Sequence, residues 1–382
     1  MIKFSNKFGE NFEEDPLYRI LKTKKYPILD FTISNPTKLE FNYSYLDINN
    51  KLSKTNFLEY SPNPKGSLEA RISISEYYKS KAREVNPENI FLTSGTSEAV
   101  SFLFKLFCNP GDTVLSASPG YPLFDFLAEL ENIKMEKFKL IKNKNRKWNI
   151  DFSHLKQLLK FKPKILLLVQ PSNPTGTILQ REDILELSNI LNKNNILLIV
   201  DEVFSDYIYS DEKCFEFKNT PSFYLNGISK TLALPQMKLG WTYHKNLAEN
   251  NINNKFEIIT DSFLSVNSIS QNLLPYLLNE KEKIQTQIKN RIQNNIQYSL
   301  NNQIKDRLFD SPSAGWYGIL NLRDSESDEE IAINILEYKN LLIHPGYMFD
   351  FEETNKLVFS LLLKEEIYRK YWIILKDFLE LR

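Results

Sequence analysis

The residues best suited to chemistry follow two apolar runs that are typical of buried strands. Asp201 comes directly after Ile196–Val200, and Asn173 follows Ile165–Val169 within a turn-forming segment. Because open parallel sheets bind ligands at the carboxyl ends of their strands, we expect both side chains at one binding edge. A carboxylate there is costly unless it meets a cation. The simpler alternatives are that Asp201 caps the next helix and that Asn173 only forms a turn.

A lysine follows the next apolar run, Phe223–Leu225. Lys230 lies between apolar segments, beside Gly227 and the hydroxyl of Ser229. Most lysines are solvated surface charges. A lysine enclosed by apolar groups, however, loses affinity for its proton and becomes a nucleophile suited to a Schiff base. Both interpretations of Lys230 fit its position in the sequence.

Two more strand ends carry residues that suit ligand binding. The segment FLTSGTSEA runs from a strand through Gly95, Thr96 and Ser97 into a helix. Backbone N–H groups at a helix N-terminus bind anions such as phosphate, although an ordinary helix cap is the simpler interpretation. Tyr121 follows the next strand and could offer a flat ring to a ligand, whereas the neighbouring Pro and Gly favour a plain turn.

Strand-like and helix-like segments alternate from about residue 66 to residue 245, and these elements must position the side chains named above. Short runs rich in Ile, Leu and Val are typical of strands that are buried on both faces. The predicted strands are Asn89–Thr93, Thr113–Ala117, Ile165–Val169, Ile196–Val200 and Phe223–Leu225, and the predicted helices are Ser67–Glu84, Glu98–Phe107 and Glu182–Asn194. The alternation predicts an α/β fold whose large domain has three layers and a mostly parallel sheet.

The C-terminal third has a different pattern, which predicts a smaller α+β domain. A long polar helical region is expected up to about Asn302. Beyond it we expect strands at Trp316–Leu322, Leu341–His344 and Leu357–Leu362, and helices at Asp328–Glu337 and Lys364–Leu381. We place the large domain at residues 46–280, and the small domain with an N-terminal arm at residues 1–45 and 281–382.

The composition argues against several classes of protein. A chain of 382 residues is long enough for about two domains, and 48 basic against 48 acidic residues give no basic footprint for nucleic acid. The two cysteines form no metal-binding or redox motif, which fits a reducing compartment. The N-terminus has no apolar signal region, and no apolar run is long enough to span a membrane. We therefore expect a cytoplasmic protein without nucleic-acid or membrane partners and without a metal site.

Taken in order, these segments resemble the class I/II aminotransferase family of fold-type I enzymes, which use pyridoxal 5'-phosphate. The family's Asn-Pro-Thr-Gly, Asp-Glu-Val-aromatic and Ser-Lys to Gly-Trp motifs correspond here to NPTG at 173–176, DEVF at 201–204 and SKTLALPQMKLGW at 229–241. Upstream, YSPNPKG at 60–66 resembles the family's Tyr-x-Pro-x-x-Gly segment with one extra residue. Downstream, SAGWY at 313–317 and HPGYMF at 344–349 resemble two small-domain motifs. The resemblance covers nearly the whole chain.

The resemblance implies a role for each of these residues. Lys230 would bind the cofactor covalently and later move a proton between substrate and cofactor, while Asp201 would pair with the pyridine nitrogen. Asn173 would bond the 3-oxygen of the ring, and Tyr121 would stack on its face. The phosphate would be held by Gly95, Thr96, Ser97, Ser229 and Lys238, and by Tyr60 from the other subunit of a homodimer, since the family builds its sites across the dimer interface.

Three residues depart from the family's cofactor site. Phe204 stands where the family usually has Tyr, and losing that hydroxyl donor to the 3-oxygen should raise the pKa of the Schiff base. Lys238 replaces the phosphate-binding Arg, so the charge is kept but the bidentate fork is lost. Gly227 occupies a place often held by a phosphate-binding Ser. These changes predict somewhat looser cofactor binding.

A fourth departure concerns the substrate. The family clamps the substrate α-carboxylate with the Arg of an Arg-x-Ser pattern, and the matching stretch KLVFS has Val358 in place of that Arg. A valine cannot form a bidentate carboxylate clamp. Lys356 lies two residues earlier on the same strand face and could substitute only as a point charge. His344 and Asn35 complete the candidate substrate residues, although a structural role is the simpler interpretation of His344. We expect a substrate that the ordinary clamp does not hold: an amine, a modified carboxylate, or an acid held differently.

Three functions fit the sequence. The first is a pyridoxal-phosphate-dependent aminotransferase that moves an amino group between a small-molecule donor and an oxo acid. The second is a lyase or decarboxylase with the same cofactor, because fold and cofactor motifs do not separate these reactions. The third is a non-catalytic ligand-binding protein with this fold, and the retention of Lys230, Asp201 and Asn173 together argues against it.

Overall fold

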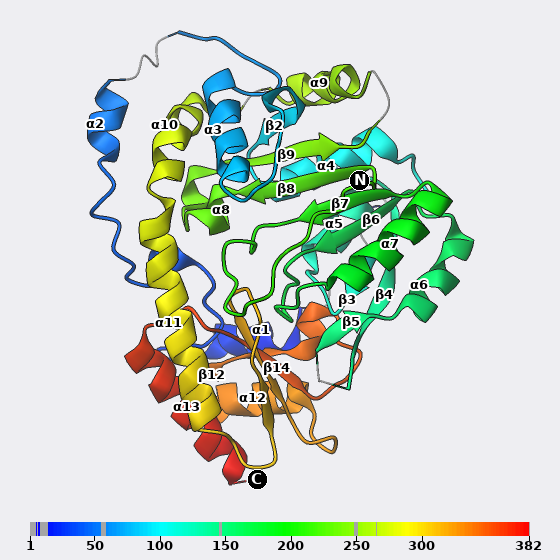
Figure 1. The fold of residues 1–382 in the computed structure, drawn as a ribbon. Coiled ribbons are helices and arrows are strands. Elements are labelled where there is room, and N and C mark those ends of the chain that lie inside the picture. Colours follow the sequence, from blue (N-terminus) through cyan, green and yellow to red (C-terminus); the bar gives the residue numbers. More distant parts are fainter. Residues whose placement is uncertain are drawn as a thin grey trace, which may run out of the picture.

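The computed structural model describes residues 5, 7, 14–54, 59–144, 147–247, 251–264 and 266–381 of the chain. It contains an eight-stranded, a four-stranded and a two-stranded sheet. Figure 1 shows the large sheet and its helices in the upper part of the molecule, with the smaller sheets below. The predicted α/β fold with a smaller second domain is confirmed.

The large sheet is mostly parallel. In spatial order its strands are β2 (Ile90–Thr93), β9 (Gly240–Lys245), β8 (Ser222–Gly227), β7 (Leu197–Asp201), β6 (Ile165–Val169), β3 (Thr113–Ser118), β4 (Lys134–Lys142) and β5 (Trp148–Ile150). The pairings β8–β7, β7–β6, β6–β3 and β3–β4 are all parallel. Among the described strands of this sheet, β9 and β5 run opposite to the direction that the other strands share.

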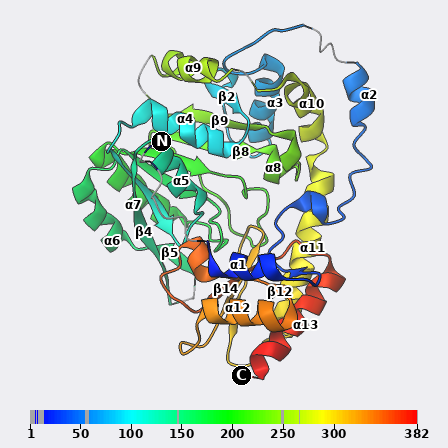
Figure 2. The ribbon, with the colours of Figure 1, turned by 180° about the vertical axis from the view of Figure 1, so that it is seen from behind.

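Both faces of the large sheet are covered by helices, as the apolar runs predict. In β6, Leu166 and Leu168 belong to one apolar cluster, whereas Ile165 and Leu167 belong to another on the opposite face. The first cluster includes side chains from α3 (Leu68–Lys79), α6 (Phe152–Leu158), α7 (Arg181–Asn194) and α10 (Ser268–Asn279), and the second from α4 (Thr96–Phe107), α5 (Leu123–Leu130) and α9 (Ile252–Ser262). Figure 2 shows α4 and α5 from this second side.

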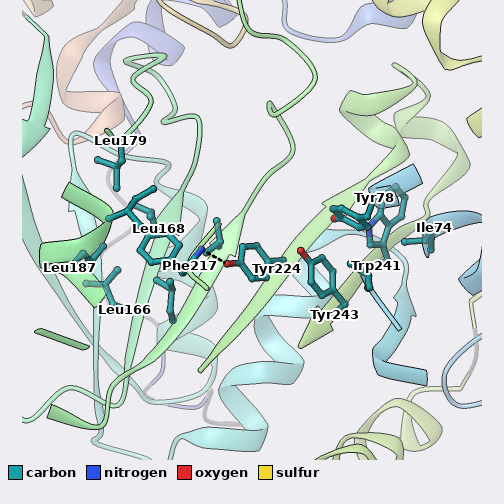
Figure 3. Close-up of a cluster of buried hydrophobic side chains, with 14 of the residues drawn as sticks. Ile74, Tyr78, Leu166, Leu168, Leu179, Leu187, Phe217, Tyr224, Trp241 and Tyr243 are labelled. Carbon is teal, nitrogen blue, oxygen red and sulfur yellow. Dashed lines mark hydrogen bonds between the residues drawn. The ribbon is translucent and has the colours of Figure 1, made fainter. Parts of the chain in front are cut away.

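The first cluster also anchors the strand that leads to the lysine. Figure 3 shows Tyr224 of β8 and Tyr243 of β9 at its centre. Their rings stack with centroids 5.0 Å apart, and the Tyr224 hydroxyl accepts a hydrogen bond from the Phe217 N–H at 2.9 Å. Both rings are almost completely buried, so close packing holds β8 in a fixed position.

The small domain is built on an antiparallel sheet. Its strands lie in the order β10 (Leu308–Asp310), β11 (Tyr317–Asn321), β14 (Lys356–Ser360) and β13 (His344–Pro345), and a separate parallel pair joins β1 (Leu29–Asp30) to β12 (Leu341–Leu342). Helices α1 (Pro16–Thr23), α12 (Asp328–Lys339) and α13 (Glu365–Glu380) surround these strands, as Figures 1 and 2 show. The buried rings of Trp316, Trp372 and Tyr368 fill its core.

Several predicted boundaries differ from the structure. The long polar region consists of three helices, α9, α10 and α11 (Lys281–Asn301), and α11 extends from α10 to α13 beside both parts of the molecule (Figure 1). The expected strand at 341–344 is two strands, because β12 pairs with β1 whereas β13 pairs with β14. β4 was not predicted, since Phe138 and Leu140 are the buried residues of a strand that otherwise carries many lysines.

The remaining elements are short. They are α2 (Ile48–Ser53), α8 (Ile228–Thr231), and the 3-10 turns η1 (Pro36–Lys38), η2 (Pro87–Asn89), η3 (Leu159–Phe161), η4 (Pro235–Met237) and η5 (Gly346–Phe349). No helix in the described part of the chain is long and apolar enough to cross a bilayer. Among the described residues, no group of His, Cys, Asp and Glu side chains is arranged to hold a metal ion.

Candidate active site

The carboxyl ends of the central strands open into a cavity of about 960 Å³. Val169, Asp201 and Gly227, the last residues of β6, β7 and β8, line it. Tyr317 and His344 line it from the small domain. The cavity therefore lies at the edge of the sheet where ligands of open α/β folds bind, with a second wall supplied by the small domain.

Lys230 reaches this cavity from α8, the short helix that follows β8. Its Nζ lies 4.8 Å from the ring centroid of Trp316 and 5.8 Å from that of Phe204. The Tyr207 hydroxyl donates a hydrogen bond of 2.7 Å to the Lys230 carbonyl, which fixes the backbone. Burial lowers the pKa of Lys230 to about 8, although the nearby Asp201 opposes the shift. Among the two interpretations of this lysine, the structure favours the enclosed, reactive amine.

Asp201 is buried at the end of β7. Burial raises its pKa to about 6, and the Val203 N–H, Lys230 and the Thr96 side chain oppose the shift. One carboxylate oxygen accepts the Val203 N–H at 3.1 Å. Because this oxygen caps the turn while the residue also lines the cavity, the two interpretations of Asp201 are compatible.

The neighbouring carboxylate, Glu202, binds partners outside the cavity. It forms a buried ion pair with Arg83 and accepts a hydrogen bond from the Tyr78 hydroxyl at 3.3 Å. Glu202 is absent from the cavity lining. The consecutive acidic residues thus have separate environments, because side chains alternate across a strand end.

The N-terminus of α4 forms a cradle in the cavity wall. Gly95, Thr96 and Ser97 line the cavity there, and the same wall includes Ser229 and Lys238. A Cβ on Gly240 would lie 2.9 Å from the Gly95 Cα, so β9 approaches the helix start closely. Free N–H groups, hydroxyls and one lysine make this wall a fitting site for an anion.

Asn173 and Tyr121 line the cavity near its floor. The Oδ1 atom of Asn173 is buried and has no hydrogen-bond partner among the described residues. A buried amide oxygen without a partner is costly, which suits a ligand-binding atom better than a plain turn. Tyr121 is partly exposed and its ring contacts Phe124 edge-on, with centroids 5.5 Å apart.

His344 lines the small-domain wall of the cavity. Burial lowers the pKa of its imidazole, against the opposing effect of Asp30 and Asp15. Val358 lies directly across from it in the β13–β14 register and is fully buried. The position where the family carries its Arg thus faces an apolar cluster.

Lys356 and Asn35 are not among the described residues that line this cavity, and their expected roles with a substrate stay predictions. Lys356 shares a strand face with Val358, as predicted, but it lies roughly 7 Å further along β14, opposite Asn321. Its Nζ bonds the Asn355 side chain at 2.5 Å and lines a separate hollow. Asn35 caps η1, where its amide oxygen accepts the Thr37 N–H at 3.1 Å.

Tyr60 lies outside the cavity of its own chain. Its side chain is 79% exposed. This placement leaves its expected role with a second subunit as a prediction.

Sequence reasoning missed several lining residues. Ser34 lies next to the predicted Asn35 and interacts with the Tyr317 hydroxyl. Phe349 and Asp15 also line the cavity. The SAGWY and HPGYMF segments contained a signal for Tyr317 and Phe349, whereas Asp15 reaches the site only through the packing of α1 on the small domain.

Comparison with known proteins establishes the family. A family model described as aminotransferase class I and II matches residues 28–367. The chain belongs to the class I and II aminotransferase family. Asn173, Asp201 and Lys230 all lie within the matched range.

The curated relatives of this aminotransferase-family chain are distant. It is 28% identical over 329 residues to a probable aspartate aminotransferase of Methanocaldococcus jannaschii, with 84% of this chain and 85% of that protein covered. It is 27% identical over 263 residues to a tyrosine aminotransferase of Dictyostelium discoideum, covering 65% of this chain and 61% of that enzyme. The chain thus matches less than two thirds of the latter protein.

Solved structures of similar fold cover almost the whole chain. An alanine aminotransferase from Pyrococcus furiosus superposes with a TM-score of 0.87 at 20% identity, covering 96% of this chain and 95% of that one. A tyrosine aminotransferase from Leishmania infantum gives a TM-score of 0.85 at 21% identity, covering 100% and 99%. At these identities the likeness establishes the fold.

Proposed function

We propose that this protein is an aminotransferase that uses pyridoxal 5'-phosphate to move an amino group between a small-molecule amino donor and an oxo acid. The observation that carries the proposal is the pairing of Lys230 with Asp201 in one cavity. Both are enclosed at neighbouring strand ends, and burial shifts the pKa of each towards neutrality, to about 8 and about 6. Family membership supports the same reaction class.

The residues of the cavity fit this cofactor. The Oδ1 of Asn173 has no partner among the described residues, and the Nδ2 group of the same amide could donate a hydrogen bond to the 3-oxygen of the ring. The α4 cradle, with Ser229 and Lys238, suits the phosphate. Tyr121 offers its ring for stacking, and Asp201 suits the pyridine nitrogen.

Each residue then has a definite task. The cofactor supplies an electron sink for the substrate carbon that loses its proton. Lys230, with its lowered pKa, binds the cofactor as a neutral amine and afterwards carries that proton. Asp201 holds a proton on the pyridine nitrogen, because a carboxylate in this buried place stabilises a cation beside it.

The proposed cofactor site includes three residues that depart from the family's pattern. Phe204 packs edge-on against Trp316 with centroids 5.5 Å apart and brings no hydroxyl to the ring 3-oxygen. A Cβ on Gly227 would lie 3.0 Å from the Gly240 Cα, so the tight pairing of β8 with β9 explains why a serine is disfavoured there. Lys238 lines the cavity and provides a positive charge where the family has its phosphate-binding arginine.

A homodimer with active sites at its interface is part of the proposal. The exposed Tyr60, outside its own cavity, is free to reach the phosphate in a second subunit. We also retain the expected domain limits, 46–280 for the large domain and 1–45 with 281–382 for the small one. A cytoplasmic location is also part of the proposal, and the cysteine content supports it because it fits a reducing compartment.

The substrate is not held by the family's carboxylate clamp. Val358 is fully buried, and no arginine is among the described residues that line the cavity. A glutamate substrate would therefore lack a bidentate partner. If glutamate reacts as efficiently as it does with a relative that has the arginine, this part of the proposal fails.

Absorption spectroscopy tests the function. Protein loaded with the cofactor should show the band of lysine-bound pyridoxal phosphate, and a suitable donor should convert it to the aminated cofactor. Lys230→Ala should lose the band, while Lys193→Ala, a change of an exposed lysine in α7, should keep it. A band that survives in Lys230→Ala would refute the assignment.

A lyase or decarboxylase is the second candidate. One relative, the S-alkyl-thiohydroximate lyase SUR1 of Arabidopsis thaliana, is 26% identical over 308 residues, with 74% of this chain and 64% of that protein covered. Release of ammonia or carbon dioxide without amination of the cofactor would favour this reaction class.

A further inference from the structure

The small-domain wall of the cavity carries no positive charge among its described residues. The cationic side chains that line the cavity are Lys230 and Lys238, and both belong to the proposed cofactor site. Val358 is packed into an apolar cluster together with Ile319 and Phe349. A substrate carboxylate placed against this wall would lose hydration without gaining a cation.

His344 is the polar residue that the fold places next to the missing clamp. The β13–β14 register sets it directly opposite Val358, and such partners lie on one face of a sheet with Cβ atoms about 5 Å apart. Val358 is covered, whereas His344 lines the cavity. The imidazole ring lies 5.8 Å from the ring of Phe349, which also lines the cavity.

His344 has unused hydrogen-bonding capacity. Its Nδ1 is buried and has no partner among the described residues. Buried N–H groups without an acceptor are rarer than buried acceptors without a donor, so we assign the proton of the neutral ring to Nε2. The Nε2–H group is then the donor that His344 can offer to a ligand in the cavity.

The electrostatic surroundings keep this ring uncharged. Burial lowers the pKa of His344, and Asp30 in β1 and Asp15 before α1 only partly oppose it. Asp15 also lines the cavity, and one of its oxygens accepts the Tyr347 hydroxyl at 2.6 Å. The wall therefore combines a neutral donor with a carboxylate, which disfavours an anionic group and admits a neutral one.

We propose that the amino donor carries an uncharged carbonyl group, such as a carboxamide, where an ordinary amino acid carries its carboxylate, and that Nε2 of His344 donates a hydrogen bond to it. This inference rests on the proposed aminotransferase function. A carboxamide has less hydration to lose than a carboxylate, and its oxygen accepts the free N–H. His344 would then determine which donors are accepted.

The reaction of such a donor balances. The substrate carbon loses its amino group and one hydrogen and becomes a carbonyl, whose oxygen comes from water. Its two electrons and the amino group pass to the aldehyde carbon of the cofactor, which becomes an amine as its own oxygen leaves as water. The products are a 2-oxo amide and the aminated cofactor.

A matched series of donors tests the inference. L-tyrosinamide, L-tyrosine and tyramine share a side chain suited to a cavity that Phe349 and Phe126 line, and differ only in the group at the reacting carbon. Stopped-flow amination of the cofactor should be at least tenfold faster with L-tyrosinamide than with L-tyrosine. Equal or faster reaction of L-tyrosine would overturn the proposal.

Variants of His344 separate recognition from folding. His344→Ala should slow L-tyrosinamide about fivefold to tenfold relative to tyramine, as expected for one lost hydrogen bond, while His154→Ala, on α6 outside the cavity, should change neither. His344→Arg should shift the preference towards L-tyrosine. An equal loss for all three donors in His344→Ala would show that the residue is only structural.

Binding without reaction gives an independent readout. Calorimetry on the loaded protein should show tighter binding of 3-(4-hydroxyphenyl)propanamide than of the matching propanoate, and His344→Ala should abolish the difference. If no donor aminates the cofactor but the amide still binds preferentially, the aminotransferase proposal fails and the role of His344 stands. If donors do aminate the cofactor but the carboxylates are preferred, the aminotransferase proposal stands and the role of His344 fails.

Discussion

The replacement of Asp201 by Asn should stabilise the cofactor-free protein while it weakens binding at the proposed cofactor site. Burial raises the pKa of Asp201 from 3.8 to about 6. Above both values the carboxyl is ionised in the folded and the unfolded chain, and the folded form bears the cost. A shift of roughly two units corresponds to about 3 kcal/mol. Since Asn keeps an acceptor for the Val203 N–H but loses the attraction to Lys230, we expect a gain of about 1–3 kcal/mol.

The dependence on pH identifies the cause of this gain. Below the unfolded value of 3.8 the carboxyl is neutral in both states, so its ionisation no longer affects stability. The advantage of Asp201→Asn should therefore be full near pH 8, smaller near pH 5, and close to zero near pH 3. Urea unfolding of cofactor-free protein at pH 8 and pH 5 measures it.

Two comparisons complete this test. Asp211→Asn, at an exposed position, should leave the free energy of unfolding unchanged at both pH values. Added pyridoxal phosphate should stabilise the original protein more than Asp201→Asn, because only the carboxylate can pair with the protonated ring nitrogen. An Asp201→Asn protein that is less stable at pH 8, or equally improved at pH 5 and pH 8, would refute the reasoning.

Three further predictions concern the proposed cofactor site and the buried ion pair of Arg83 with Glu202. Gly240→Ala forces its Cβ to within 2.9 Å of the backbone of Gly95 and should lower the free energy of unfolding in urea by about 1–3 kcal/mol. The Cβ of Gly95→Ala meets open space, so this variant should keep the free energy of unfolding and bind the cofactor more weakly. The reverse pattern would contradict the cradle at the start of α4. Arg83→Met leaves the buried carboxylate of Glu202 without its cation and should lower the free energy of unfolding in urea by about 3–5 kcal/mol. Adding Glu202→Gln should restore part of this stability. If it restores none, the loss comes from the missing arginine side chain and not from the unpaired charge. Phe204→Tyr should lower the pKa of the Schiff base between Lys230 and the cofactor, because the new hydroxyl donates a hydrogen bond to the 3-oxygen of the cofactor ring. A spectroscopic titration measures this pKa. An unchanged pKa would mean that the hydroxyl does not reach the ring.

Much of the site could be predicted because its residues follow local patterns. Asp201 ends a buried strand, and Lys230 comes a few residues after another. Parallel strands bring such ends together whatever the details of packing. The strands that escaped prediction, such as β4 and β9, mix polar with apolar residues and depend on their neighbours for their conformation.

The substrate side could not be predicted in the same way. Lys356 shares a strand face with Val358 but lies too far along the strand to reach the cavity. Asn35 turns its amide to its own backbone, while the adjacent Ser34 lines the cavity. In both cases the residue type was plausible, and the direction of the side chain depended on contacts with distant segments.

The sequence by itself determined the fold class of this protein and pointed to its candidate reacting groups. Apolar periodicity is a local property, and Asn173, Asp201 and Lys230 are tied to it by adjacency along the chain. Only the tertiary structure decided how strongly burial shifts the pKa values of Lys230 and Asp201, and that His344 lies opposite Val358. Desolvation and cross-strand register arise when distant segments pack together, so the residues next to a position in the sequence do not determine them.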